Sequence, residues 1–118
     1  MVTIEQLAEA ALNGESLLLR SLTQDLLREN PSLSECPKPQ TEDSRIMAAA
    51  ASLVELLSLR LHQTPPPWAK DVGALPEPIY LLKAAGSMKR LRILCETEAP
   101  EPLRKRGFYA PPNFLEFA

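Results

Sequence analysis

The sequence contains few of the residues that catalytic and metal sites most often use. Its 118 residues include two cysteines, one histidine and one tryptophan. Cys36 and Cys95 lie far apart and form no Cys-x-x-Cys pair, which argues against a disulfide framework or a zinc site and favours a reducing compartment. His62 has no second base or nucleophile near it in sequence, so we expect it at a helix end, where its charge complements the helix dipole. The sequence therefore predicts no catalytic residue, no metal and no cofactor.

Glycine and long apolar runs are also scarce. The four glycines form no phosphate-binding loop, which argues against a nucleotide-dependent enzyme. The apolar runs fall far short of the roughly 20 residues that span a bilayer. Glu5 and Glu9 interrupt what would have to be the apolar part of a signal peptide, so we expect a cytoplasmic protein. No stretch alternates convincingly between apolar and polar residues, which predicts the absence of a β-sheet.

Composition and charge favour one folded domain over residues 1–118. Hydrophobic residues make up 45% and charged residues 24%, which are ordinary values for a globular protein. The net charge of −2 is divided unevenly: residues 1–59 carry a balance of −5, and residues 60–118 carry +3. The acidic and basic halves could attract each other within the fold or between copies. Neither half is basic enough to indicate nucleic-acid binding by composition alone.

The first predicted element is a helix or helix pair over residues 3–30. Thr3 and Gln6 fit a capping box, in which each side chain satisfies a free backbone donor of the other. The Asn13-Gly14 pair predicts a break, and the Asn30-Pro31 pair predicts the end. Two sets of apolar residues recur at helical spacing and are predicted to face the core: Ile4, Leu7, Ala8 and Ala11, then Leu18, Leu22 and Leu26 with Leu19 and Leu27 beside them.

After a loop over residues 31–42, a central helix is predicted within residues 43–63. Asp43 or Ser44 can cap its first turn. The alanines at 48–51 allow a neighbouring helix to approach closely. The predicted buried stripe is spaced by three and four residues and consists of Ile46, Ala50, Leu53, Leu57 and Leu61.

The second half of the chain is rich in proline. Residues 64–77 are predicted to form a linker in which Trp68 covers the end of the helical core. A helix pair is predicted over residues 78–98, and a proline-rich and aromatic tail over residues 99–118. Pro78 would begin the first helix of this pair and Ser87 would cap the second. The predicted apolar faces of this pair are Ile79, Leu82 and Ala85, then Met88, Leu91, Leu94 and Cys95. The predicted fold is a compact all-α bundle of four or five helices with a mostly irregular C-terminal segment.

The segment 75–117 carries the most distinctive composition. It holds all five Phe and Tyr residues and six of the twelve prolines. Rings held near prolines lose little entropy on docking, so this segment either folds over its own helices or enters a groove of another protein. The candidate contacts for a protein partner are Arg104, Lys105, Arg106, Phe108, Tyr109 and Phe114.

Nucleic-acid binding is the alternative interpretation of the same half. Lys89, Arg90 and Arg92 precede the basic triplet 104–106, and rings follow at 108 and 109. Positive charge for phosphates and rings for stacking are the combination that suits single strands. The acidic residues interspersed among these bases favour a solvated face or an acidic protein partner instead.

Three stretches of the C-terminal part resemble a group of small uncharacterised bacterial proteins, including cyanobacterial ones. They are Leu75-Pro-Glu-Pro-Ile-Tyr-Leu-Leu-Lys-Ala-Ala, Met88-x-x-Leu-Arg-x-Leu-Cys-Glu96, and Pro102-Leu-Arg-Lys-Arg-Gly-Phe-Tyr-Ala-Pro-Pro-Asn-Phe-Leu115. Genes of that group often neighbour nucleotidyltransferase-like genes of the toxin–antitoxin type. The resemblance implies an antitoxin-like role with such a protein as partner. Together with the residues, it predicts a non-enzymatic protein-binding accessory, with a nucleic-acid-binding regulator and a structural subunit of a homo-oligomer as alternatives.

Overall fold

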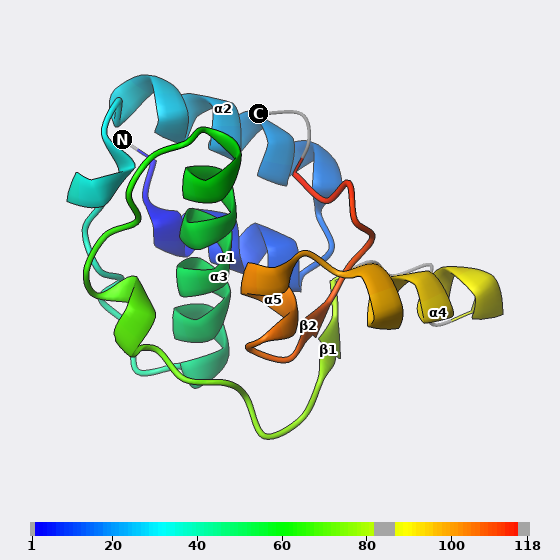
Figure 1. Cartoon of the computed structure of the whole chain (residues 1–118). Helices are drawn as coiled ribbons and strands as arrows, with labels where there is room; N and C mark the ends of the chain where they lie inside the picture. The colour runs from blue at the N-terminus through cyan, green and yellow to red at the C-terminus, as the bar shows by residue number, and fades with distance from the viewer. Residues whose placement is uncertain (1, 82–86, 116–118) are drawn as a thin grey trace.

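The computed structural model describes residues 2–81 and 87–115 and has a mostly helical fold (Figure 1). Within this part of the chain, five α-helices are accompanied by two short strands and two 3-10 turns. In chain order they are α1 (Ile4–Leu12), α2 (Ser16–Glu29), η1 (Leu33–Glu35), α3 (Ser44–Arg60), η2 (Ala69–Asp71), β1 (Ile79–Tyr80), α4 (Lys89–Glu98), α5 (Glu101–Arg104) and β2 (Phe108–Tyr109). The predicted compact helical class with four or five helices is confirmed.

Local signals place the first two helices as predicted. The Thr3 hydroxyl accepts a hydrogen bond from the Gln6 backbone N–H, and the Gln6 side chain accepts one from the Thr3 N–H at 2.9 Å. At the other end of α1, Gly14 adopts a φ of +70°, a left-handed conformation that favours glycine. The N–H groups of Gly14 and Glu15 bond back to the carbonyls of residues 11 and 10, which closes the helix.

The core-facing side of α2 differs slightly from the prediction. Leu19 and Leu26 are buried, whereas Leu18 is 44% exposed. Leu22 and Leu27 are half-buried against the core. The four-residue spacing suggested Leu18, but Leu19 takes the inward position in the structure.

Helix α3 forms the centre of the molecule, with α1 and α5 packed against it (Figure 1). The Asp43 side chain caps it by accepting the Arg45 backbone N–H at 2.9 Å. The predicted stripe underestimates its burial, because residues 48–54 and 56–58 are all buried. At the ends of the stripe, Ile46 is half-buried and Leu61 is 38% exposed. The four alanines allow the close contact with α1 that the sequence predicted.

His62 terminates α3 through its backbone. It lies just after the C-cap residue Leu61 with a φ of +55°, and its side chain is exposed. The N–H of Gln63 bonds to the Ser58 carbonyl at 2.8 Å, the pattern of a left-handed helix cap. The predicted position at a helix end is therefore confirmed, and the backbone turn provides the cap there.

The predicted absence of a β-sheet is wrong, and so is the predicted helix start at Pro78. Ile79 and Tyr80 form strand β1 rather than the start of a helix, and β1 pairs in parallel with β2. Ile79 lies opposite Phe108, and Tyr80 lies opposite Tyr109. The ladder joins residues far apart in the sequence, so no local alternation of apolar and polar residues predicts it. The remaining members of the predicted apolar face, Leu82 and Ala85, lie outside the described residues.

A buried arginine joins three elements behind this ladder. Arg106 is 2% exposed and donates hydrogen bonds to the Glu55 carboxylate of α3. It also donates to the backbone carbonyls of Ala69 at 2.7 Å, Val72 at 3.1 Å and Pro102 at 3.3 Å. Because all of these acceptors are brought together by one side chain, Arg106 connects α3, the η2 region and α5.

The C-terminal segment folds over its own domain as far as residue 115. Phe108, Ala110 and Leu115 are buried in the same core as α1 and α3. Arg60, at the end of α3, donates to the carbonyls of Phe114 and Pro112. Of the two interpretations of this segment, the intramolecular one describes the structure.

Acid is expected to weaken the domain through Glu55. Burial by itself would raise the pKa of this carboxyl, but hydrogen bonds and positive charge from Arg106 and Lys105 outweigh it and lower the pKa. A lowered native pKa adds stability above the unfolded value of about 4.3, and this contribution disappears as pH falls through the native pKa. The excess stability of the wild type over Glu55→Gln should therefore be constant near neutral pH and shrink below about pH 4.

Denaturant titrations at several pH values measure this difference. Glu42→Gln is the matched control, because it removes the same charge from an exposed position. An excess over Glu55→Gln that stays constant down to pH 2–3 would contradict the role given to the Arg106–Glu55 pair.

Candidate functional site

Two of the predicted partner contacts lie inside the domain. Arg106 is 2% exposed and Phe108 is fully buried, so neither is available at the surface. Their assignment as contact residues is corrected. The physical reason is that Glu55, the partner of Arg106, is 51 residues away in sequence, and only the fold brings the two together.

The other four candidates retain some exposure, in different settings. Arg104 is exposed and donates to the Thr97 carbonyl at the end of α4 at 3.2 Å. Lys105 extends its ammonium group to Glu55 at 3.1 Å. Tyr109 is half-buried, with its ring centre 5.3 Å from that of Tyr80. Phe114 is half-buried against the core.

Helix α4 projects away from the rest of the molecule (Figure 1). Of the predicted apolar face, Cys95 alone is buried; Leu91 and Leu94 are half-buried, and Met88 is 56% exposed. Ile93, on another side of the helix, is 48% exposed. The predicted apolar face is therefore only partly buried, and α4 presents apolar side chains at the surface.

The charges of α4 are arranged against its own dipole. Lys89, Arg90 and Arg92, the predicted nucleic-acid contacts, are exposed in its first turns, and no acidic residue lies in the first turn. The last turn has no basic residue and carries Glu98. A helix is stabilised by acidic groups at its N-terminus and basic groups at its C-terminus, by about 0.3–1 kcal/mol per exposed charge. In α4 this preference is reversed at both ends.

The C-terminal half of α4 contacts the body through Glu96 and Thr97, among others. The Tyr80 hydroxyl donates to the Glu96 carboxylate, and this hydrogen bond, with burial and the Glu96 charge, raises the pKa of Tyr80. The Arg104 guanidinium donates to the Thr97 carbonyl. These contacts fix the base of the helix and leave its basic N-terminal half pointing outward.

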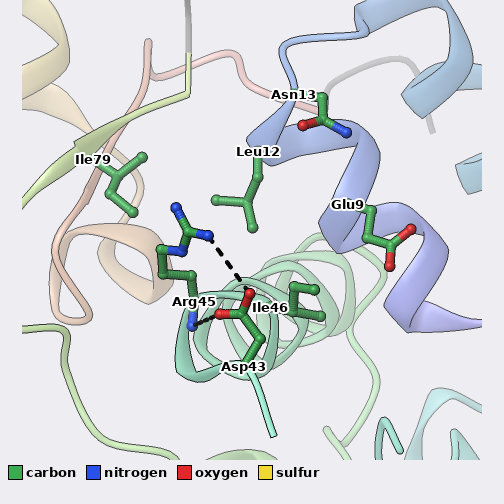
Figure 2. A pocket seen from close by; sticks show the side chains of 7 residues that line it. All are labelled: Glu9, Leu12, Asn13, Asp43, Arg45, Ile46 and Ile79. Atoms are coloured by element: carbon green, nitrogen blue, oxygen red, sulfur yellow. Dashed lines mark hydrogen bonds and ion pairs between the residues drawn. The ribbon is translucent and has the colours of Figure 1, made fainter. Parts of the chain in front are cut away.

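A second surface feature is a cavity of about 290 Å³ at the start of α3 (Figure 2). Figure 2 shows the Arg45 side chain extending between Leu12 and Ile79, with Asp43 beside it. The Asp43 carboxylate accepts the Arg45 N–H, which, with the nearby guanidinium, lowers the pKa of Asp43. No local pattern in the sequence indicates this cavity, because its walls come from α1, α3 and β1.

Neither surface carries the groups of a hydrolytic or metal-dependent site. The cavity beside Arg45 contains carboxylates and one guanidinium but no nucleophile with an adjacent base. Within residues 2–81 and 87–115, no group of three or more His, Cys, Asp and Glu side chains could hold a metal ion. In the same ranges, no helix has both the length and the apolar character required to cross a membrane.

No protein-family model matches the chain, and no curated protein or solved structure matches it at a significant level.

Proposed function

We propose that this protein is a non-enzymatic accessory that docks an acidic protein partner through α4. The observation that carries this proposal is the reversed charge pattern of α4, combined with its projection from the domain. Lys89 and Arg90, in the first turn, oppose the helix dipole and so destabilise the helix that carries them. A local arrangement that opposes stability is typical of a functional surface.

An anionic partner would turn the same arrangement into a favourable one. The positive end of the helix dipole and the three cations then act on one negative surface. Met88 and Ile93 add exposed apolar area beside the charges. An interface core is commonly apolar with a charged rim, and α4 offers both on one short element.

A protein partner fits these observations better than a nucleic acid does. The rings that could have stacked on bases are engaged elsewhere, since Phe108 is buried and Tyr109 packs against Tyr80. The antitoxin-like role implied by the resemblance of the C-terminal part would be one form of this docking. The nucleic-acid alternative then depends on the basic side chains of α4 alone.

Reversing two charges tests the proposal. Lys89→Glu combined with Arg90→Glu should weaken partner binding by at least about tenfold, because like charges then face each other. The same change should leave the isolated protein at least as stable, since acidic groups suit the first turn. Partners captured from the native host and identified by mass spectrometry would be purified and titrated against both proteins, and thermal unfolding would report stability.

Lys38→Glu combined with Lys70→Glu is the matched control. It changes the net charge by the same amount at exposed positions outside α4, so it should keep the partner. Equal affinity of the α4 variant and the wild type would overturn the role of α4. Salt-dependent binding to mixed-sequence oligonucleotides, lost in the same variant, would instead support the nucleic-acid alternative.

A further inference from the structure

A separate cavity of about 380 Å³ lies between the start of α1 and the segment after η1. Its buried lining residues are Ile4, Leu26, Cys36 and Pro39. Burial raises the pKa of the Cys36 thiol, so this wall is uncharged at neutral pH. The volume falls within the range of about 300–1,000 Å³ that small-molecule sites occupy.

Both walls of this cavity are fixed by contacts that need no ligand. On one side, the capping box of Thr3 and Gln6 sets the start of α1, and the Val2 N–H bonds to Glu29 of α2 at 2.9 Å. On the other side, the Trp68 indole N–H donates to the Cys36 carbonyl at 2.8 Å. A preformed site avoids the cost of ordering its walls when it binds.

Proline gives the outer wall its apolar character. Pro37 and Pro39 have no backbone N–H, and their rings fix the local φ angles. Water needs two to four polar partners to occupy a cavity well, and the side chains of the buried wall offer few. The polar and charged lining residues are exposed or half-buried and are Thr3, Glu5, Asn30, Glu35, Lys38 and Gln40.

We propose that this cavity is a binding site for a small, uncharged, largely apolar molecule with one hydrogen-bonding group. The apolar part contacts the buried wall formed by Ile4, Leu26 and Cys36, and the polar group lies toward Thr3 and Gln40. A ring or branched aliphatic group fits the buried wall, which offers no partner for a charge. This site is independent of α4.

Trp68 reports on occupancy, because the carbonyl that binds its indole belongs to a lining residue. Benzyl alcohol, which carries one ring and one hydroxyl, is the probe. Titration should change the emission of this single tryptophan in a saturable way, with Kd on the order of millimolar for so small a ligand. At ten times Kd the melting temperature should rise by about 5 °C.

Filling the cavity locates the site. Val2 lines it and is half-buried, so Val2→Phe should reduce the affinity for benzyl alcohol by at least about tenfold while the protein remains folded. Leu12→Phe is the control, because Leu12 is also half-buried but lines the other cavity, beside Arg45. Unchanged binding by Val2→Phe, equal loss in both variants, or the absence of a saturable wild-type response would overturn the proposal.

If Val2→Phe does not fold, alkylation of the wild-type cysteines shows where benzyl alcohol binds. Cys36 lines the cavity, whereas Cys95 lies on α4, and both thiols are buried. Benzyl alcohol should slow the labelling of Cys36 several-fold more than that of Cys95. Equal slowing at the two thiols would overturn the placement, because it would indicate stabilisation without local protection.

Discussion

Replacing Arg106 with Met should lower the free energy of unfolding by about 3–5 kcal/mol, as the removal of one member of a buried ion pair commonly does. The variant loses the hydrogen bonds to Glu55 and to three backbone carbonyls. Glu55, whose side chain is 11% exposed, then keeps Lys105 as its charged neighbour. The apolar volume of Met substitutes for part of the lost packing, so the cost arises mainly from unpaired polar groups.

Two further variants separate the ion pair from the packing. Lys105→Met should cost less than about 1 kcal/mol, because the lysine side chain is 45% exposed and water screens its charge. Combining Arg106→Met with Glu55→Leu should restore part of the loss, since no buried carboxylate is then left without its main partner.

Urea denaturation at neutral pH measures these differences as shifts of the midpoint at constant slope. A loss below 1 kcal/mol for Arg106→Met would show that the buried guanidinium is dispensable. Equal losses for Arg106→Met and Lys105→Met would show that the two bases act alike, contrary to their different exposures.

Features that depend on nearby residues could be predicted from the sequence. The capping box at Thr3, the break at Asn13-Gly14 and the cap at Asp43 each involve groups within a few residues of one another. Steric and hydrogen-bonding rules for such short spans hold regardless of the rest of the fold. The core of α3 was predicted for the same reason, through the helical spacing of its apolar residues.

Features that depend on distant pairing could not be predicted. Strand β1 has two residues and becomes a strand only because residues 108–109 lie beside it. Pro78 was a reasonable helix start by local rules, and the ladder overrode them. The cavity lined by Cys36 likewise needs α1, α2 and the segment after η1 to meet.

The candidate site residues show the same distinction between local and distant features. The basic residues of α4 were identified from sequence, because charged residues clustered on a short helix remain exposed unless another segment covers them. The triplet 104–106 looked uniform in sequence, yet its members differ in exposure. Arg104, the last residue of α5, is at the surface and binds α4, whereas Arg106 lies two residues beyond α5 and is buried against Glu55.

Replacing Phe108 with Ala should cost about 3–5 kcal/mol, the usual loss for truncating a buried aromatic side chain. Phe108 is fully buried in the main core, and its strand pairs with Ile79. Native domains are stable by only about 5–15 kcal/mol, so the melting temperature should fall by ten degrees or more. This outcome is expected because the C-terminal segment is part of the fold.

Comparison with Phe114→Ala tests whether the C-terminal segment stabilises the fold or only docks a partner. Phe114 is half-buried, so its truncation should cost distinctly less than that of Phe108. If the C-terminal segment served only to dock another protein, both variants would melt like the wild type and lose the partner captured in the α4 experiment. Normal melting of Phe108→Ala would therefore return the aromatic segment to the role of an intermolecular anchor. A large loss of stability in the purified chain, with no partner present, would show that the rings hold the domain together.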